Sequence, residues 1–458
     1  MDQTAPTDVD VVVVGLGAGG ELAAARLAAA GLRVVAVERG LVGGECPFAG
    51  CTPTKLAIRA ADLLAESRRA AALAGEVDVR PDWAPVAARI RDANHDWDDA
   101  THVRPLEEAG VSVVRGHGRL AGPGRVVVET GSGPREYAAA RGVVLDTGTE
   151  PGVPPIDGLA ATPYWTNREV VRVTELPDSL VVLGGGPIGT ELAQLFARFG
   201  VAVALLETAD RILGPEEPES STVVARALRA DGVEVRTGVD IRRIDHDGAF
   251  RIRTDGGDLA TSALLVATGR RTNLDDLGLE TVGLDPTAPT LEVDERMRAG
   301  ERLWAVGDIT GKGEYTHVSL YQAGVAVRDL LGEDGPWADY RAVSRVTFTD
   351  PEVGSVGLTE EQARAARLDV RVGSADLGGS SRGWIHGPGG DGLVKLVADA
   401  GRGVLVGATA VGPSGGEVLG LLAAAVHAEI PVGTLRRMHF AYPTFHRVVL
   451  GALVDLGL

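Results

Sequence analysis

The 458-residue chain is 45% hydrophobic and 24% charged, so it can bury a large core, and its length predicts roughly two to four domains. Its formal net charge of −18 argues against nucleic-acid partners, because it repels phosphate backbones. The first residues are acidic and polar, unlike those of a signal peptide. The sequence contains no unbroken run of about 18 apolar residues, so we expect no membrane span. We therefore expect a cytoplasmic protein.

A nucleotide-binding βαβ unit is predicted at the start of the chain. Residues 11–14 are four valines, typical of a buried parallel strand, and an alanine-rich helix follows them. Between the two lie the glycines of a GxGxxG motif: Gly15, Gly17 and Gly20. These glycines allow a pyrophosphate to approach the helix N-terminus. The next strand, 33–38, ends on Glu38, which is placed to accept hydrogen bonds from a ribose.

The only two cysteines, Cys46 and Cys51, lie in the glycine-rich segment GGECPFAGCTPTK, residues 43–55. A structural disulfide is disfavoured in a reducing cytoplasm, and no compact Cys/His cluster supplies the four ligands that zinc prefers. Two inert thiols and a redox-active dithiol remain possible, and the spacing alone does not separate them. We favour the redox-active pair.

A second unit of the same kind follows in residues 179–207. The glycines lie between a Val/Leu strand and a helix, at Gly184, Gly186 and Gly189, and the second strand closes on Glu207. Two dinucleotide folds imply two nucleotides, most economically a flavin and a nicotinamide, between which a hydride can pass. Residues 141–151 and 263–273 each predict a strand that runs into a Thr-Gly turn, and Asp308 is predicted at a strand end.

The stretch 341–458 changes character and predicts an antiparallel sheet with helices, one of them at 415–430. The expected fold class is therefore α/β, with two Rossmann-like dinucleotide-binding domains and a C-terminal α+β domain.

With these motifs in order, the chain resembles the flavoprotein disulfide reductases, the family of lipoamide dehydrogenase, glutathione reductase and mercuric reductase. The segment 43–55 is similar to the family's redox-disulfide motif. The motifs VGD, FTDPEVGSVGLTE and GATAVGP follow in the family's order. The resemblance covers essentially the whole chain. It implies an FAD domain over 1–145, a nicotinamide domain over 146–268, a return to the FAD region over 269–338, and a dimerisation domain over 339–458. It also implies a homodimer in which the last domain of one subunit completes the partner's active site.

The resemblance also implies a role for each matching residue. Cys51 would lie next to the flavin as the charge-transfer thiolate, and Cys46 would be the interchange thiol. Lys55 would approach the flavin and pair with Glu191. The implied FAD contacts are Gly15, Gly17, Gly20, Glu38, Gly44, Glu45, Lys55, Gly118, Thr147, Gly148, Gly307, Asp308 and His317. The implied NAD(P)H contacts are Gly184, Gly186, Gly189, Glu207 and Gly269, with Arg270 near the place where the two nucleotides meet.

One departure from the family pattern concerns the catalytic base. The family carries a His before Pro-Thr and a Glu shortly after it, whereas this chain has Tyr442 and Arg447 at those places. A phenol with an ordinary pKa of ~10 is a poor base near neutral pH. His439 and His446 are close in sequence but out of register. The chain also lacks the C-terminal cysteine pair of mercuric reductases, so mercuric reduction is disfavoured.

Three functions stay open on the sequence. The first is an NAD(P)H-dependent flavoprotein that uses Cys46 and Cys51 on a disulfide or specialised acceptor. The second is a reductase of quinones, metal complexes or oxidants that acts from the flavin. The third is a non-catalytic flavin-binding redox sensor. Glu207 favours NADH over NADPH, because a carboxylate repels a 2′-phosphate, although Arg211 four residues later weakens that exclusion.

Overall fold

The computed structural model describes residues 6–458, and packing divides the chain into two compact units. The first unit combines residues up to 53 with 91–151 and 270–339, and the second combines 54–90, 152–269 and 340–458. The units cut across the four stretches implied by the resemblance, and that four-domain division stays a prediction. No helix within residues 6–458 is long and apolar enough to cross a membrane.

The first unit contains an eight-stranded sheet with a parallel centre. Strands run in the order β16-β17-β6-β1-β2-β3, and the β4–β5 hairpin adds to β6. The strands are β1 (Thr7–Val14), β2 (Val34–Glu38), β3 (Ser112–Arg115), β4 (His117–Leu120), β5 (Arg125–Thr130), β6 (Gly133–Leu145), β16 (Arg298–Gly300) and β17 (Leu303–Ala305). The central valines of β1 are fully buried, as expected for a strand covered on both faces.

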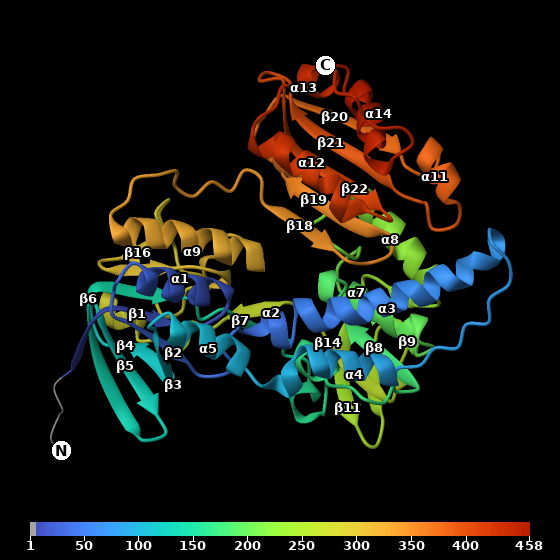
Figure 1. The fold of residues 1–458 in the computed structure, drawn as a ribbon. Helices are drawn as coiled ribbons and strands as arrows, with labels where there is room; N and C mark the ends of the chain where they lie inside the picture. Colours follow the sequence, from blue (N-terminus) through green and yellow to red (C-terminus); the bar gives the residue numbers. More distant parts are fainter. Residues whose placement is uncertain (1–5) are drawn as a thin grey trace. The chain divides into compact units, whose positions relative to one another are not determined.

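Helices α1 (Ala18–Ala29) and α9 (Thr316–Leu331) lie side by side on this sheet (Figure 1). Small residues of α1, among them Gly20, Ala23 and Ala24, are buried and permit the close approach. The other elements of this unit are α2 (Glu45–Phe48), the start of α3 (Cys51–Arg69), η2 (His95–Trp97), α5 (Ala100–Glu108), η4 (Leu279–Val282) and η5 (Asp308–Thr310). Strands β7 (Thr149–Pro151) and β15 (Arg270–Thr272) form a separate antiparallel pair.

The second unit contains a parallel four-stranded sheet in the order β10-β9-β8-β14, beside a small antiparallel sheet β11-β12-β13. The strands are β8 (Ser179–Leu183), β9 (Ala202–Leu206), β10 (Glu234–Arg236), β11 (Ile241–His246), β12 (Phe250–Thr254), β13 (Leu259–Thr261) and β14 (Ala263–Val266). Its helices are the remainder of α3, η1 (Ala70–Ala72), α4 (Ala84–Ala93), η3 (Leu159–Ala161), α6 (Asn167–Val170), α7 (Pro187–Arg198) and α8 (Pro218–Ala230).

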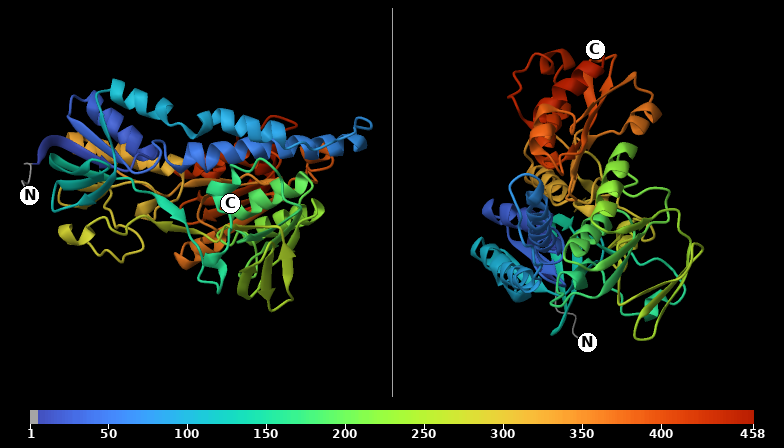
Figure 2. Two further views of the ribbon diagram at one scale, coloured as in Figure 1. Left: turned by 90° about the horizontal axis from the view of Figure 1, so that it is seen from below. Right: turned by 90° about the vertical axis from the view of Figure 1, so that its right-hand side faces the viewer.

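The same unit ends in a five-stranded antiparallel sheet, β18-β19-β22-β21-β20, which confirms the predicted C-terminal α+β architecture. Its strands are β18 (Ser344–Thr347), β19 (Glu352–Gly357), β20 (Val370–Asp376), β21 (Leu393–Asp399) and β22 (Val404–Gly412). Its helices are α10 (Glu360–Ala365), α11 (Ser381–His386), α12 (Gly415–His427), α13 (Val432–Leu435), η6 (Phe445–Arg447) and α14 (Val448–Asp455). Helices α12 and α14 pack on this sheet and share its apolar core (Figures 1 and 2).

A buried arginine explains why these parts of the second unit pack as one body. The Arg198 side chain on α7 is only 1% exposed and reaches three carboxylates, those of Asp62 at 2.7 Å, Asp231 at 2.9 Å and Asp350 at 2.6 Å. These partners come from α3, from the end of α8 and from the loop before β19. Removal of the arginine would take away a cation that three partly buried carboxylates share, so we expect this contact to contribute to the stability of the unit.

The predicted elements agree with the observed ones to within a few residues. Strand β1 begins four residues earlier than the valine run, and α12 ends three residues before the predicted helix end. Asp308, predicted at a strand end, instead begins a 3₁₀ turn three residues after β17 ends at Ala305.

Candidate active site

The first glycine turn joins β1 to α1 and leaves no room for side chains. Gly15 has a φ of +94°, and a Cβ there would meet the carbonyl oxygen of Asp146 at 2.2 Å. A Cβ on Gly20 would meet the carbonyl oxygen of Gly15 at 2.1 Å. The backbone is therefore drawn tightly under the N-terminus of α1, the geometry that exposes N–H groups to a pyrophosphate.

Two carboxylates hold this turn. Glu38, at the end of β2, accepts hydrogen bonds from the Leu16 N–H at 2.8 Å and the Gly40 N–H at 2.7 Å. Asp146, directly after β6, accepts the Gly20 N–H at 2.7 Å and is nearly fully buried. Burial raises the pKa of Asp146 to about 8. Glu38 thus fixes the backbone at the beginning of the turn, and the buried Asp146 fixes the backbone of α1 that follows the turn.

The second glycine turn, between β8 and α7, repeats this geometry in the second unit. Gly184 has a φ of +104°, and a Cβ on Gly189 would lie 1.9 Å from the Gly184 carbonyl oxygen. Glu207 accepts the Gly185 N–H at 2.6 Å and the Ala209 N–H at 2.8 Å. Both turns present the crowded glycines and the strand-end carboxylate that a dinucleotide requires, so the residues fit two such cofactors.

The remaining residues of the expected FAD set also lie in the first unit, apart from Lys55. Gly118 on β4 sits against Val14 and Val37, and Gly307 donates its N–H to Gln322 at 2.7 Å. The others are Gly17 as the N-cap of α1, Thr147 bonded to the Asn273 carbonyl, Gly148 with a φ of +63°, Asp308 bonded to Thr149, and His317 stacked on Tyr315. In the second unit, Gly186 is the N-cap of α7 and Gly269 has a φ of +121°.

The cysteine segment lies against the first glycine turn. The Gly43 N–H donates to the Leu16 carbonyl at 2.8 Å, and a Cβ on Gly44 would meet the Cα of Gly17 at 3.0 Å. This contact brings the thiols to the carboxyl edge of the sheet, where the predicted flavin site lies.

The two thiols contact each other at the start of two helices. Cys51 is the first residue of α3, and its Sγ lies 3.5 Å from the Oγ1 of Thr316, the first residue of α9. The hydrogen bond with Cys51, together with burial, raises the pKa of the Cys46 thiol. The start of α3 and the Thr316 hydroxyl both lie at Cys51, where a helix N-terminus favours a thiolate.

Lys55 and Glu191 form the predicted ion pair within the second unit. The Lys55 Nζ lies 2.6 Å from a Glu191 carboxylate oxygen, and the other oxygen accepts the Phe348 N–H at 2.7 Å. The Lys55 ammonium also lies over the Phe348 ring, 4.9 Å from its centroid. Glu191 is almost fully buried, so the pair and the N–H bond together hold Lys55 in one place.

Arg270 joins the cysteine segment to strand β7 within the first unit. Its guanidinium bonds the Glu45 carboxylate at 2.5 Å, and it bonds the hydroxyl and the carbonyl of Thr149 at 2.6 Å and 3.0 Å. The Thr149 hydroxyl in turn bonds Asp308 at 2.6 Å. Burial raises the pKa of Asp308.

The C-terminal segment carries Tyr442 on the surface of the second unit, 68% exposed. The Arg447 guanidinium lies over its ring, 5.5 Å from the centroid. His446 contacts Thr444 at 3.4 Å. None of the described residues brings a carboxylate to Tyr442 or Arg447, so the His–Glu arrangement of the family has no equivalent here.

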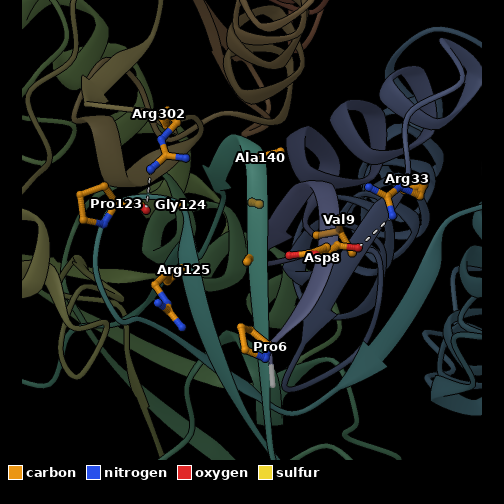
Figure 3. A pocket seen from close by; sticks show the side chains of 11 residues that line it. Pro6, Asp8, Val9, Arg33, Pro123, Gly124, Arg125, Ala140 and Arg302 are labelled. Carbon is orange, nitrogen blue, oxygen red and sulfur yellow. Dashed lines mark hydrogen bonds between the residues drawn. The ribbon is translucent and has the colours of Figure 1, made fainter. Parts of the chain in front are cut away.

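A pocket lies at the end of the first unit's sheet where β1 begins, away from the glycine turn that follows β1 (Figure 3). This open pocket of about 480 Å³ is lined by the start of β1 and by three arginines, Arg33, Arg125 and Arg302. Each arginine side chain already bonds the protein: Arg33 with Asp10 and the Asp8 carbonyl, Arg125 with Glu136, and Arg302 with the Pro123 carbonyl. Since dinucleotides bind at the carboxyl ends of the strands, this pocket is not their site. Within residues 6–458 no group of three His, Cys, Asp or Glu side chains could hold a metal ion.

Sequence reasoning missed three residues of this site. Asp146 follows a buried valine run, and an acid at such a strand end was the signal that could have found it. Thr316 directly precedes the predicted His317 but carries no motif of its own. Phe348 begins the segment 348–360, whose role in holding Glu191 depends on a contact across 157 positions.

Comparison with known proteins agrees with this geometry. Residues 9–326 match the pyridine nucleotide-disulphide oxidoreductase model, and residues 343–452 match the dimerisation domain of the same family. The chain is 33% identical to a mercuric reductase of Streptomyces lividans, over 96% of this chain and 94% of that protein. It is 32% identical to a dihydrolipoyl dehydrogenase of Halobacterium salinarum, over 97% and 96%.

Solved structures agree with these relatives. The HOCl-induced flavoprotein disulfide reductase RclA from Escherichia coli, as its Cu(II) complex, is similar with a TM-score of 0.86 and 27% identity, over 98% of this chain and 99% of that one. LpdA from Mycobacterium tuberculosis gives a TM-score of 0.86 at 26% identity, over 98% and 99%. These matches confirm the resemblance and the fold class expected from the sequence.

Proposed function

Because the chain belongs to the pyridine nucleotide-disulphide oxidoreductase family, we propose that it oxidises NADH and delivers electrons through Cys46 and Cys51 to a small external acceptor. Members of this family are NAD(P)H-dependent flavoenzymes, so FAD and NAD(P)H are the cofactors of this enzyme. The observation that carries the proposal is the contact of the two thiols with each other and with Thr316, beside the first glycine turn.

The two thiols have different roles in this reaction. Bound FAD supplies a ring that accepts a hydride from the nicotinamide and passes two electrons to the cysteine disulfide. Cys51, at the start of α3, holds the inner position, where the helix N-terminus favours a thiolate, and Cys46 is the interchange thiol. With an external disulfide, Cys46 gives up its proton and attacks one sulfur as a thiolate, and the departing sulfur takes up a proton and leaves as the first thiol. Cys51 then attacks Cys46, which releases the second thiol and restores the disulfide.

The C-terminal segment limits which acceptor this enzyme uses. Exchange with an external disulfide requires an acid–base group for the departing thiolate, and such groups contribute typically ~10²–10⁴-fold. Tyr442 and Arg447 replace that group and its orienting acid, so lipoamide and glutathione disulfide are expected to be poor substrates. We infer a specialised acceptor. The homodimer, in which this segment completes the partner's thiol site, and the cytoplasmic location belong to the same proposal; the dimerisation-domain match supports the dimer.

A second candidate is reduction of quinones, metal complexes or oxidants directly from the flavin. The observation that favours it is the exposed Tyr442, with Arg447 in place of the family's Glu. Reduction of an acceptor at the flavin needs no His–Glu base, so this replacement does not slow it. The RclA structures, described as HOCl-induced and as a Cu(II) complex, support oxidants and metal complexes as an acceptor class.

An acceptor panel separates the two candidates. NADH and NADPH would be tested with disulfides, quinones and Cu(II) complexes, on the wild type and on Cys46→Ser. Loss of turnover in Cys46→Ser supports the thiol route, and unchanged turnover supports direct reduction from the flavin. Failure of NADH and NADPH to reduce the flavin of the wild type would overturn both.

Two further variants test the assigned roles. Cys51→Ser should abolish the long-wavelength charge-transfer absorbance of the partly reduced protein while FAD stays bound, and a persisting band would contradict the assignment of Cys51. Tyr442→His with Arg447→Glu should partly restore lipoamide reduction. Robust lipoamide turnover by the unmodified enzyme would show that another group already acts as the base.

A further inference from the structure

The contact between Glu45 and Arg270 has no role in the reaction described above, yet Glu45 directly precedes Cys46. We propose that Glu45 is a positioning residue of the thiol pair: it links the short helix α2, which carries Cys46, to strand β15 through Arg270. In this way it sets the equilibrium between the Cys46–Cys51 disulfide and the two free thiols. The inference rests on the proposed redox role of these cysteines.

Helix α2 has little stability of its own. It spans four residues, Glu45–Phe48, after Gly44, whose φ is +70°. An isolated single turn costs more conformational entropy than its hydrogen bonds return. Some other contact must hold Cys46 at the distance from Cys51 that a disulfide requires.

Both the backbone and the side chain of Glu45 provide such contacts. Its carbonyl oxygen accepts the Ala49 N–H at 2.8 Å and the Gly50 N–H at 2.6 Å, which closes the turn between the two cysteines. Its carboxylate bonds the Arg270 guanidinium at 2.5 Å. One residue therefore shapes the turn and fixes it to a separate strand pair.

Arg270 is in turn fixed by its own partners. Its Nε donates to the Thr149 hydroxyl and its Nη2 donates to the Thr149 carbonyl, and Thr149 bonds Asp308. The side chains of Arg270 and Glu45 are only 15% and 25% exposed, so water screens this pair less than a surface ion pair. A forked guanidinium with three bonds holds a defined position, unlike a single mobile contact.

The neighbouring position of the same strand pair offers a matched control. Arg271 follows Arg270 on β15 and pairs with Glu150 on β7 and with Asp275, but its side chain is 58% exposed. Within residues 6–458, no hydrogen bond or ion pair joins Arg271, Glu150 or Asp275 to the cysteine segment 43–55. Loss of the Arg271 pair would therefore perturb β7–β15 without releasing α2.

The thiol–disulfide equilibrium of the holoenzyme tests the inference directly. Disulfide formation joins the two Sγ atoms and gives two protons and two electrons to glutathione disulfide, which becomes two glutathione thiols. The protein would be equilibrated anaerobically in glutathione buffers, alkylated and analysed by mass spectrometry, with long-wavelength absorbance read in parallel. Glu45→Ala should shift the equilibrium toward free thiols about tenfold, because a charge-assisted hydrogen bond is lost.

Conservative variants and the control decide the outcome. Glu45→Gln keeps an oxygen that accepts from Arg270 and should shift the equilibrium less than about threefold, and Glu150→Ala should not shift it. An unshifted Glu45→Ala, or an equal shift in Glu150→Ala, would overturn the inference. If Glu45→Ala fails to fold, Arg270→Lys replaces it: lysine lacks the planar fork through which Arg270 bonds Glu45 and Thr149 at once, and an unshifted equilibrium there equally contradicts the inference. A wild type that forms no disulfide would instead defeat the proposed function.

Discussion

The two glycine turns are nearly the same structure built twice, and they differ mainly in what supports them. In each, a positive-φ glycine ends a buried strand, a later glycine packs on its carbonyl, and a glutamate at the end of the second strand accepts two backbone N–H groups. In the first turn Asp146 follows the neighbouring strand and bonds the Gly20 N–H, whereas in the second turn Ala267 occupies the corresponding place.

This difference supports the proposed assignment of the flavin to the first turn and the nicotinamide to the second. The Ser319 hydroxyl on α9 also donates to Asp146 at 3.3 Å, so the first turn is fixed by side chains from β6 and α9. In the second turn the residue behind Gly184 is Ala267, which has no carboxylate to accept the Gly189 N–H. A turn held by these additional side-chain bonds suits a flavin that stays bound, and a turn without them suits a nicotinamide that exchanges at every turnover.

The largest expected effect separates the two turns by cofactor. Gly20→Ala and Gly189→Ala each force a Cβ into a carbonyl oxygen at about the same distance, so either should weaken its own nucleotide about 10- to 100-fold. Gly20→Ala should release FAD, measured by the fluorescence of the free flavin. Gly189→Ala should raise the KM for NADH while FAD is retained. Equal loss of both nucleotides in either variant would show that the turns are not independent.

The second prediction concerns the carboxyl group present only in the first turn. Asp146→Ala leaves the buried Gly20 N–H without its acceptor and should lower the free energy of unfolding by about 1–3 kcal/mol. Asp146→Asn keeps an acceptor oxygen and should be close to the wild type at low pH. Ser319→Ala serves as a comparison, because it removes only the longer bond.

The pH dependence of Asp146→Asn sharpens the same point. Because burial raises the folded-state pKa of Asp146 to about 8, its neutral form is favoured in the folded protein. The contribution of the neutral Asp146 carboxyl group to the free energy of unfolding is fully present below the unfolded pKa of ~3.9. It is lost as pH rises through the folded-state pKa of about 8. Asp308 and Glu38, the acids that face Asp146, act in the same direction. The melting temperature of Asp146→Asn relative to the wild type should therefore rise between pH 5 and 8. A constant difference would contradict a neutral Asp146.

The smallest expected effect concerns the glutamate that each turn has at the end of its second strand, Glu38 in the first turn and Glu207 in the second. Glu207 should favour NADH over NADPH by about tenfold in kcat/KM, since its carboxylate repels a 2′-phosphate. Arg211 does not offset this, because it already bonds the Leu213 and Gly214 carbonyls and the Ser221 hydroxyl. Glu207→Gln should reduce the preference, whereas Glu38→Gln in the first turn should leave it unchanged. Comparable kcat/KM for both nucleotides in the wild type would show the preference to be wrong.

The sequence by itself determined the two glycine turns, the strands that lead into them and the antiparallel C-terminal sheet. These features depend on short-range rules: a valine run buries a strand, and only glycine fits where a Cβ would strike the carbonyl of Asp146 or Ala267. The separate roles of the two thiols and the pairing of Lys55 with Glu191 came from family motifs and not from local physics. The structure then showed Lys55 bonded to Glu191, 136 positions away.

Only the tertiary structure decided which side chains support these motifs. Asp146 reaches Gly20 across 126 positions, and Arg270 reaches Glu45 across 225. Neither residue belongs to a periodic pattern that predicts its partner, because each contact depends on how β6, α1 and the β7–β15 pair pack in three dimensions. Burial then changes the chemistry of the groups it encloses, as it does for the carboxyl group of Asp146, and no local sequence pattern specifies how deeply a group is buried.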